Sequence, residues 1–332
     1  MLTKPRLFLT VLALSCLIGV RTPVQADEKL LPNDTELVWS FNIKNLMGSQ
    51  AFNKHFKEMM EKGLRENEQA QKVLTAISMD PMKDLHSITV SLSGLKIEPG
   101  NPRPDMEIFV VVKGNFDTTK IETAISLFAA DGKNKVSTSQ MGARKVFEFK
   151  GDDRTFFGAF VGKDTAVFAD KKERLAAGLD RAEGKSSGAM NKDFARVMGR
   201  VDTKRSVWMA AVVPPSVKDL AKLLPRGEVF DKIEGAVFSV NVTDGMAMEM
   251  SVYTTDKEAA QQIKDFFQEQ KENLGPLTLQ IPDADLGAEV ADIISKMKIS
   301  QNDKTASLSM DIGAGTLEKI VKFAKAQQGR GN

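Results

Sequence analysis

The sequence predicts an α+β fold of two related halves, in which helices cover antiparallel sheets. Segments with strand periodicity and segments with helical periodicity alternate along the chain. Several strand segments also follow one another across short glycine turns, as antiparallel hairpins do. The only two tryptophans, Trp39 and Trp208, each follow a valine at the start of an apolar run. We therefore expect an internal duplication with Trp39 and Trp208 as its markers.

Residues 1–26 predict a signal peptide. A short basic start precedes an apolar run over 7–20, which is too short for a membrane span of about 20 residues. Val24 and Ala26 are small residues at the positions that a signal peptidase reads, so we expect cleavage between Ala26 and Asp27. Cys16 leaves open the alternative of a lipid-modified cysteine. No later segment is long and apolar enough for a second span, so we expect an exported chain, periplasmic or extracellular, without a membrane span after signal removal.

Removal of the signal changes the charge and the cysteine count. Lys4, Arg6 and Arg21 leave with it and no acid does, so the formal net charge falls from +2 to −1. A chain near neutrality gives no electrostatic reason to expect nucleic acid as a partner. The single cysteine also leaves, so the mature chain is cysteine-free and has no thiol nucleophile, thiolate ligand or disulfide.

The first half begins with a strand over 35–43, rich in β-branched and aromatic residues. Ser49 fits the N-cap of a helix over 50–64, and a second helix covers 67–77. Asp80 and Pro81 predict the cap and first position of a short helical turn. Two strands joined by a glycine- and proline-rich loop come next, then a helix capped by Asp117, a meander of four strands and a closing helix. These segments are 86–94, 106–114, 95–105, 117–129, 134–140, 144–150, 154–160, 165–170 and 171–184.

The second half repeats the order with fewer strands. It predicts a strand, a helix, a hairpin that turns at Asp244 and Gly245, two helices, two strands and a final helix. These segments are 206–214, 215–224, 233–242, 246–255, 256–270, 283–296, 297–302, 305–312 and 315–327. The two copies match best around Leu85 and Ile233, which open corresponding strands. We therefore predict domains over 27–185 and 186–332, and expect both indoles to be buried or at the boundary between the halves.

The start of the mature chain resembles a family. "LLPNDTELVWSFNIKNLMGSQAF" and "ENEQAQKVLTAISMDPMKDLHSITV" look like exported bacterial proteins of the planctomycete type, of uncharacterised role, that begin with a Pro-x-Asp-Thr segment. The resemblance implies export and a bacterial source. It implies no activity.

Residues that could carry chemistry are few. The two histidines, His55 and His86, lie far apart on different elements, and we interpret each as packed against its neighbours. No metalloprotease, nucleophile-elbow, P-loop or calcium-loop motif is present. We therefore predict no catalytic residue, no cofactor and no metal site.

Two other features have structural interpretations. The glycine turn over 313–316 predicts an N-cap at Thr316 rather than a phosphate cradle, because it lacks the lysine of a P-loop. Two acid pairs could bind a cation weakly, but hairpin and capping roles explain them: Asp152 with Asp153, and Asp283 with Asp285.

The aromatic composition favours a core over a polar recognition surface. The chain has 19 Phe and 16 Met but one tyrosine, Tyr253. The leading hypothesis is an exported, non-enzymatic binding or scaffold protein of the bacterial envelope with an unknown protein partner. The alternative is a carrier of an apolar small molecule, bound in the adaptable Met and Phe interior between sheet and helices. The third is a hydrolase with dispersed carboxylates.

Overall fold

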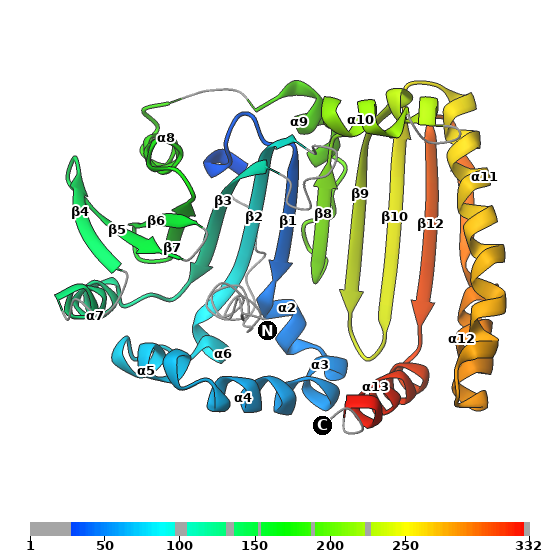
Figure 1. Cartoon of the computed structure of the whole chain (residues 1–332), viewed down its shortest axis with the longest axis horizontal. Helices are drawn as coiled ribbons and strands as arrows, with labels where there is room; N and C mark the ends of the chain where they lie inside the picture. Colours follow the sequence, from blue (N-terminus) through cyan, green and yellow to red (C-terminus); the bar gives the residue numbers. More distant parts are fainter. Residues whose placement is uncertain are drawn as a thin grey trace, which may run out of the picture. The chain divides into compact units, whose positions relative to one another are not determined.

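The computed structural model describes residues 28–96, 105–130, 136–151, 154–186, 190–222 and 227–328. The predicted signal peptide, Cys16, the cleavage site at Ala26 and Asp27, and the acid pair Asp152 and Asp153 lie outside these residues. The fold is α+β, as the sequence predicts, and all twelve predicted strands are present (Figure 1).

The chain divides into two compact units. The first contains the described residues up to Met47 and those of Met59–Lys192, and the second contains Gly48–Glu58 and the described residues from Asp193 onward. The predicted boundary between the two repeats lies after residue 185, whereas the boundary between the two compact units lies after Lys192. The segment Gly48–Glu58 joins the second unit, which the order of elements did not indicate.

The first unit holds seven antiparallel strands in the order β1-β2-β3-β7-β6-β5-β4. Consecutive strands pair except where β7 returns to β3. The elements are η1 (Glu28–Leu30), β1 (Leu37–Asn42), α2 (Ile43–Gly48), α4 (Lys57–Glu66), α5 (Glu68–Ala76), α6 (Pro81–Asp84), β2 (Leu85–Lys96), β3 (Asp105–Gly114), α7 (Thr118–Ala130), β4 (Val136–Met141), β5 (Arg144–Lys150), β6 (Thr155–Val161), β7 (Thr165–Ala169) and α8 (Lys172–Ala182).

The second unit holds five strands in the order β11-β12-β10-β9-β8. Figure 1 shows α10 at one end of these strands, α13 at the other, and α11 and α12 beside β12. The elements are α3 (Gln50–His55), α9 (Lys192–Met198), β8 (Val207–Ala211), α10 (Pro215–Ala221), η2 (Gly227–Lys232), β9 (Ile233–Val242), β10 (Met246–Thr254), α11 (Lys257–Leu274), η3 (Gly275–Gln280), α12 (Ala284–Lys296), β11 (Lys298–Asn302), β12 (Thr305–Ile312) and α13 (Ala314–Gln328).

The predicted caps form at five helices. The side chains of Ser49, Asp80, Asp117, Asp256 and Asp283 accept hydrogen bonds from backbone N–H groups in the first turns of α3, α6, α7, α11 and α12. The predicted N-cap at Thr316 is wrong. Helix α13 already begins at Ala314, so Thr316 lies inside its first turn.

Two helical predictions also need correction. The single helix expected over 50–64 is divided into α3 and α4 at Phe56, which has φ −117° and closes α3 as its C-cap. The division places α3 in the second unit, where Ala51 packs with Leu317 and Val321 of α13. Helix α9 was not predicted, because "KDFARVM" is too short for helical periodicity to stand out.

Hairpins β2–β3 and β9–β10 carry the same irregularity. Leu85 pairs with Gly114 and Ser87 with Lys113, so His86 is an extra residue in β2. Glu234 is the corresponding extra residue in β9, because Ile233 pairs with Thr254 and Gly235 with Tyr253. The bulge therefore occupies the same position in both hairpins.

The strand register shows that Trp39 and Trp208 do not occupy equivalent positions in the two units. With the bulges superposed, Ser91 of β2 corresponds to Ser239 of β9; their partners in the preceding strand are Val38 and Trp208. Trp208 therefore corresponds to Val38, and Trp39 corresponds to Met209. Trp208 is 1% exposed and Trp39 is 43% exposed, so of the two outcomes expected for the indoles, burial holds for Trp208 and not for Trp39. A shift of one residue moves a side chain to the other face of a sheet.

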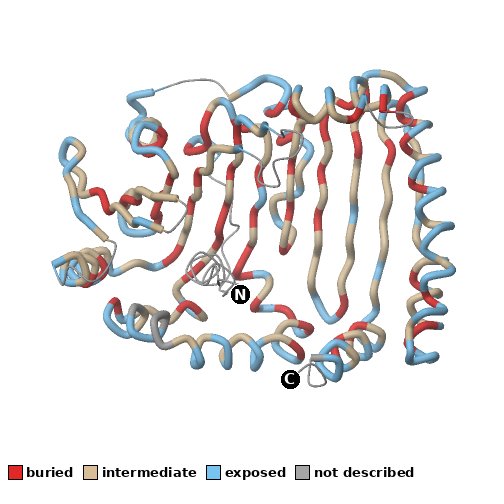
Figure 2. The backbone as a smooth tube through the Cα atoms, in the orientation of Figure 1, coloured by how far each residue is buried: buried red, intermediate tan, exposed pale blue. Residues whose placement is uncertain are grey.

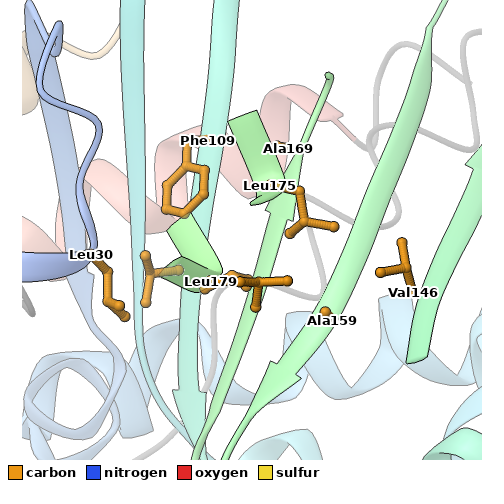
Figure 3. Close-up of a cluster of buried hydrophobic side chains, with 9 residues drawn as sticks. Leu30, Phe109, Val146, Ala159, Ala169, Leu175 and Leu179 are labelled. Carbon is orange, nitrogen blue, oxygen red and sulfur yellow. The ribbon is translucent and has the colours of Figure 1, made fainter. Parts of the chain in front are cut away.

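The largest described core lies on one face of the first unit. Side chains from β3, β5, β6 and β7 pack there against Leu175 and Leu179 of α8 and against Leu30 (Figure 3). Phe109, Val146 and Leu175 are fully buried. In Figure 2 the buried residues gather in the strands, whereas α4 and α11 carry long exposed stretches.

Candidate functional site

The other face of the first sheet is apolar and only partly covered. Trp39, Val90, Val110 and Phe168 lie directly opposite one another across β1, β2, β3 and β7. The last three are half-buried, and the indole of Trp39 stacks on Phe41 with ring centroids 5.5 Å apart. We call these four residues the Trp39 row. A row of apolar side chains that helices leave half-exposed is unusual for a sheet whose other face already packs on a core.

The second unit has a similar apolar face. Two rows of directly opposed residues cross β8, β9, β10 and β12: Val207, Val240, Met248, Met310, and Met209, Phe238, Met250, Leu308. All eight are half-buried. The opposite face of these strands is polar in the middle of the sheet, where Ser251 and Ser307 share a hydrogen bond of 2.9 Å.

The Met248 row, defined as Val207, Val240, Met248 and Met310, lies between two packed clusters on this face. Toward one end of the strands, α11 packs on Val252 and Ala306, with Met250 and Leu308 against them. Toward the other end, Val242, Met246 and Ile312 pack against α13 and α3. The Met248 row belongs to neither cluster. The arrangement leaves an apolar strip between two sets of helices.

Asp170 introduces a carboxyl group at the apolar face of the first unit. Its backbone N–H donates to Ile108 at 3.2 Å, which continues the β3–β7 ladder and places Asp170 two residues beyond Phe168 on the same face. The side chain is 8% exposed. Oδ2 accepts from Arg154 at 3.2 Å, but Oδ1 is buried with no hydrogen-bond partner. Burial outweighs the attraction of Arg154 and raises the pKa of the Asp170 carboxyl.

A polar cleft of about 530 Å³ opens at this edge of the face. It is formed at the neighbouring ends of β2, β3, β6 and β7, where charged side chains alternate in sign. Its lining includes Lys96, Asp105, Met106, Glu107, Arg154, Asp170 and Lys171. Lys96 is exposed and has no hydrogen-bond or ion-pair partner among the residues that the structure describes.

Arg174 fixes one wall of the cleft. Its guanidinium pairs with Asp34 at 2.7 Å, donates to Ser93 at 3.2 Å and makes two hydrogen bonds with Oε2 of Glu107. Lys171 binds Oε1 of the same carboxylate at 2.5 Å. Hydrogen bonds from Lys171 and Arg174 lower the pKa of Glu107, so both of its oxygens are engaged as acceptors.

The Pro-x-Asp-Thr segment has a structural role beside this wall. The Thr35 hydroxyl donates to the Pro32 carbonyl at 2.6 Å and also shares a hydrogen bond of 2.8 Å with Ser91. Asp34, next to it, is the partner of Arg174. The segment is thus a tight turn that presents an acid to α8.

The residues singled out in the sequence do not come together in a site. His55 is 8% exposed and lies beside Phe56, with ring centroids 6.4 Å apart. His86 is the extra residue of the β2 bulge, and burial lowers its pKa. Asp283 caps α12. Among the described residues, no group of three His, Cys, Asp or Glu is arranged to hold a metal ion, and no helix is long and apolar enough to cross a membrane.

Sequence reasoning missed Asp170, Arg154, Arg174 and Lys96. Arg174 meets Glu107 and Asp34 from 67 and 140 residues away, and no local spacing signals such contacts. One signal was available for Asp170. It ends the apolar strand "TAVFAD" and alternates with Ala166 and Phe168, so it faces the apolar side of the strand. A carboxyl group in such a position needs a polar partner.

Comparison with known proteins adds no functional assignment. No family model matches the chain, and no curated protein sequence matches it. A solved structure described as "Structure of crystal form I of TP0453" matches with a TM-score of 0.42 and 7% sequence identity, over 91% of this chain and 99% of its own. A likeness of this size supports no statement about function. The resemblance to planctomycete-type exported proteins stays a prediction.

Proposed function

We propose that this chain is an exported, non-enzymatic protein that binds an apolar ligand on its half-exposed sheet faces. The observation that carries the proposal is the pair of apolar rows, the Trp39 row and the Met248 row, which packing leaves partly uncovered. Exposing aligned apolar side chains has a free-energy cost in water that a bound apolar ligand removes.

The dimensions favour an acyl chain. Three strand spacings separate β8 from β12, which gives the Met248 row a length of about 14 Å. The flanking positions Met246 and Met250 lie four residues apart on β10, so the strip between them is also about 14 Å wide at backbone level. Methionine suits such a ligand, because its flexible thioether adapts to a chain without a fixed shape.

The alternatives receive less support. A scaffold that binds a protein would be expected to offer tyrosine and arginine with a polar rim. These rows share tryptophan, phenylalanine and methionine with protein interfaces, but they contain no tyrosine or arginine. A hydrolase would need carboxylates free to exchange protons with substrate. In the cleft, both oxygens of Glu107 are engaged and Oδ1 of Asp170 is closed off from solvent.

Tryptophan emission tests the proposal in the first unit. Dodecan-1-ol added below its solubility limit should cover the exposed indole of Trp39 and shift its emission to shorter wavelength. Trp208 is already buried, so it should not respond. The matched control is Trp39→Phe, in which the shift should vanish. No spectral change with dodecan-1-ol or a longer alcohol would contradict binding at this face.

Neighbouring residues on β10 provide the test in the second unit. Met248 points to the apolar face and Ala247 to the opposite one, and both are half-buried. Met248→Asp should abolish retention of an alkyl compound in native mass spectrometry, whereas Ala247→Asp should leave it intact. Equal retention by both variants would exclude the Met248 row as a binding surface.

Export and duplication are part of the same proposal. Export rests on residues 1–26, and mass analysis of the secreted protein should give a chain that begins at Asp27. Duplication is supported by the shared order of elements and by the bulges at His86 and Glu234. A homologue with a single unit, carrying the bulge at the equivalent position, would strengthen it. A bulge that shifts position freely among homologues would count against it.

A further inference from the structure

We propose that four methionines of the second unit, Met246, Met248, Met250 and Met310, bind Cu(I) through their thioether sulfurs. We call these four residues the methionine cluster. The inference goes beyond the proposed function, because it adds a metal site to the apolar face that carries the Met248 row. Thioether sulfur is a ligand of a different kind from the histidine, cysteine and carboxylate groups on which the expectation of no metal site rested.

The strand register gathers the methionine cluster around Met310. Strands β10 and β12 lie side by side (Figure 1), and Met310 pairs directly with Met248. Met246 and Met250 lie two positions from Met248 along β10, so both are diagonal to Met310 on the same face. The Cβ atoms of a direct pair are about 5 Å apart and those of a diagonal pair about 7–8 Å, which long side chains can bridge. Three of these sulfurs can therefore meet at one ion.

A fifth methionine adjoins the cluster. Lys298, the first residue of β11, pairs with Ser309 of β12. In an antiparallel pair the preceding residue, Met297, comes next to Met310. Five of the 16 methionines of the chain thus lie on three neighbouring segments, which concentrates soft sulfur donors at one place.

The fold does not require methionine at these positions. Counted from the bulges, Ile108 and Val110 of β3 in the first unit correspond to Met248 and Met250 of β10. Strands favour β-branched residues such as isoleucine and valine. These residues would make an equally apolar strip in the second unit, but they have no atom that binds a metal ion. The property that the methionines add is a soft ligand.

The donor set favours a soft ion over a hard one. Thioether sulfur suits Cu(I), whereas Ca²⁺ and Mg²⁺ need oxygen ligands. The acids of β10 and β12, Glu249 and Asp311, alternate with the methionines along their strands and so point to the opposite face. These two strands therefore offer sulfur and no carboxylate on the face of the cluster.

The methionine cluster is also accessible to an ion. Met250 packs with Ile263 and Phe267 of α11, and Met246 packs with α13, whereas Met248 and Met310 lie between these two contacts. All four are half-buried. An ion can thus reach the sulfurs from solvent, and its charge stays close to water instead of entering a closed apolar core.

Silver provides the first probe, because Ag(I) shares the soft character of Cu(I) and is stable in air. The full chain carrying Cys16→Ser is titrated with silver nitrate in chloride-free buffer, since the thiolate of Cys16 would bind the same ion. Native mass spectrometry should show one Ag(I) retained per chain. Cu(I), kept reduced by ascorbate in the absence of oxygen, should be retained in the same way.

Two leucine replacements locate the ion. Leucine keeps the volume and apolar character of methionine and removes the sulfur. Met310→Leu should weaken Ag(I) binding roughly tenfold or more, because loss of a ligand costs at least as much affinity as loss of a group that orients one. Met209→Leu is the matched control: Met209 is half-buried on the same face, but it lies on β8, two strands from β10. By NMR, Ag(I) should shift the methyl signal of Met248 and leave that of Met209 unchanged.

The outcomes separate the metal site from the proposed function. Both leucine variants should retain the alkyl compound, because the face stays apolar. Weaker Ag(I) binding in Met310→Leu alone supports the site. Failure to retain Ag(I) or Cu(I), or equal binding of Ag(I) by Met310→Leu and Met209→Leu, would overturn the metal site and leave the apolar ligand in place. Loss of the alkyl compound from every variant, with the silver result as expected, would refute the proposed function of the second unit and leave the metal site.

Discussion

Replacement of Arg174 tests whether the wall of the cleft depends on a single side chain. Arg174 is 8% exposed, and its guanidinium contacts Glu107, Asp34 and Ser93. Methionine is the informative substitute, because it keeps the apolar stem packed in α8 and removes only the charged head. Asp34 would then lose its ion-pair partner, and Glu107 would keep only Lys171.

The expected loss follows from the exposure of each partner. Glu107 is 34% exposed, so its charge-assisted hydrogen bonds contribute about 1.5–3 kcal/mol. Asp34 is 63% exposed, and its pair contributes at most about 1 kcal/mol, since water can replace the guanidinium. We therefore expect Arg174→Met to lower the local free energy of unfolding by about 1.5–4 kcal/mol. Arg174→Lys should lose about half as much, because one ammonium cannot reproduce the forked contacts.

Hydrogen exchange measures this loss where it occurs. Amides in β2 and β3 of the first unit should exchange faster in Arg174→Met, while amides in β9 and β10 serve as an internal control in the second unit. Lys171→Ala removes the exposed partner of the same carboxylate and should have the smaller effect. A change in β2 and β3 of less than about 0.5 kcal/mol would refute the role assigned to Arg174.

Two further predictions concern Trp208 and Asp170. Because Trp208 is buried and Trp39 is exposed, Trp208→Ala should lower the free energy of unfolding by about 3–5 kcal/mol, whereas Trp39→Ala should change it by less than about 1 kcal/mol. Equal losses in urea unfolding would contradict this difference in burial. The pKa of Asp170 is raised above its usual value of 3.8, so the ionised carboxylate destabilises the fold. The stability of the natural chain relative to Asp170→Asn should therefore fall as pH rises from about 4 through the folded pKa. A stability difference that stays constant or grows from pH 4 to 7 would contradict this sign.

The elements were predictable from local pattern, and the cleft was not. Ser49, Asp80 and Asp256 cap their helices because a short polar side chain can reach free N–H groups within the same turn, and a sequence records this directly. The cleft depends on which strand β7 pairs with. Its return to β3 brings Asp170 and Arg154 beside Met106, and no local signal specifies that pairing.

The tryptophans show why a shared sequence context is a weaker guide than register. Trp39 and Trp208 both follow a valine, and this similarity suggested equivalent positions. The bulges at His86 and Glu234 fix the pairing on either side of them, and counting from each bulge places Trp208 opposite Ser239 but Trp39 opposite Val90. An offset of one residue moves a side chain to the other face of the sheet. One indole is therefore buried, and the other lies on the apolar face that we assign to the ligand. If the units are copies, a tryptophan at residue 38 would have entered the buried side of its sheet, and the first unit would lack the exposed aromatic ring that begins the Trp39 row.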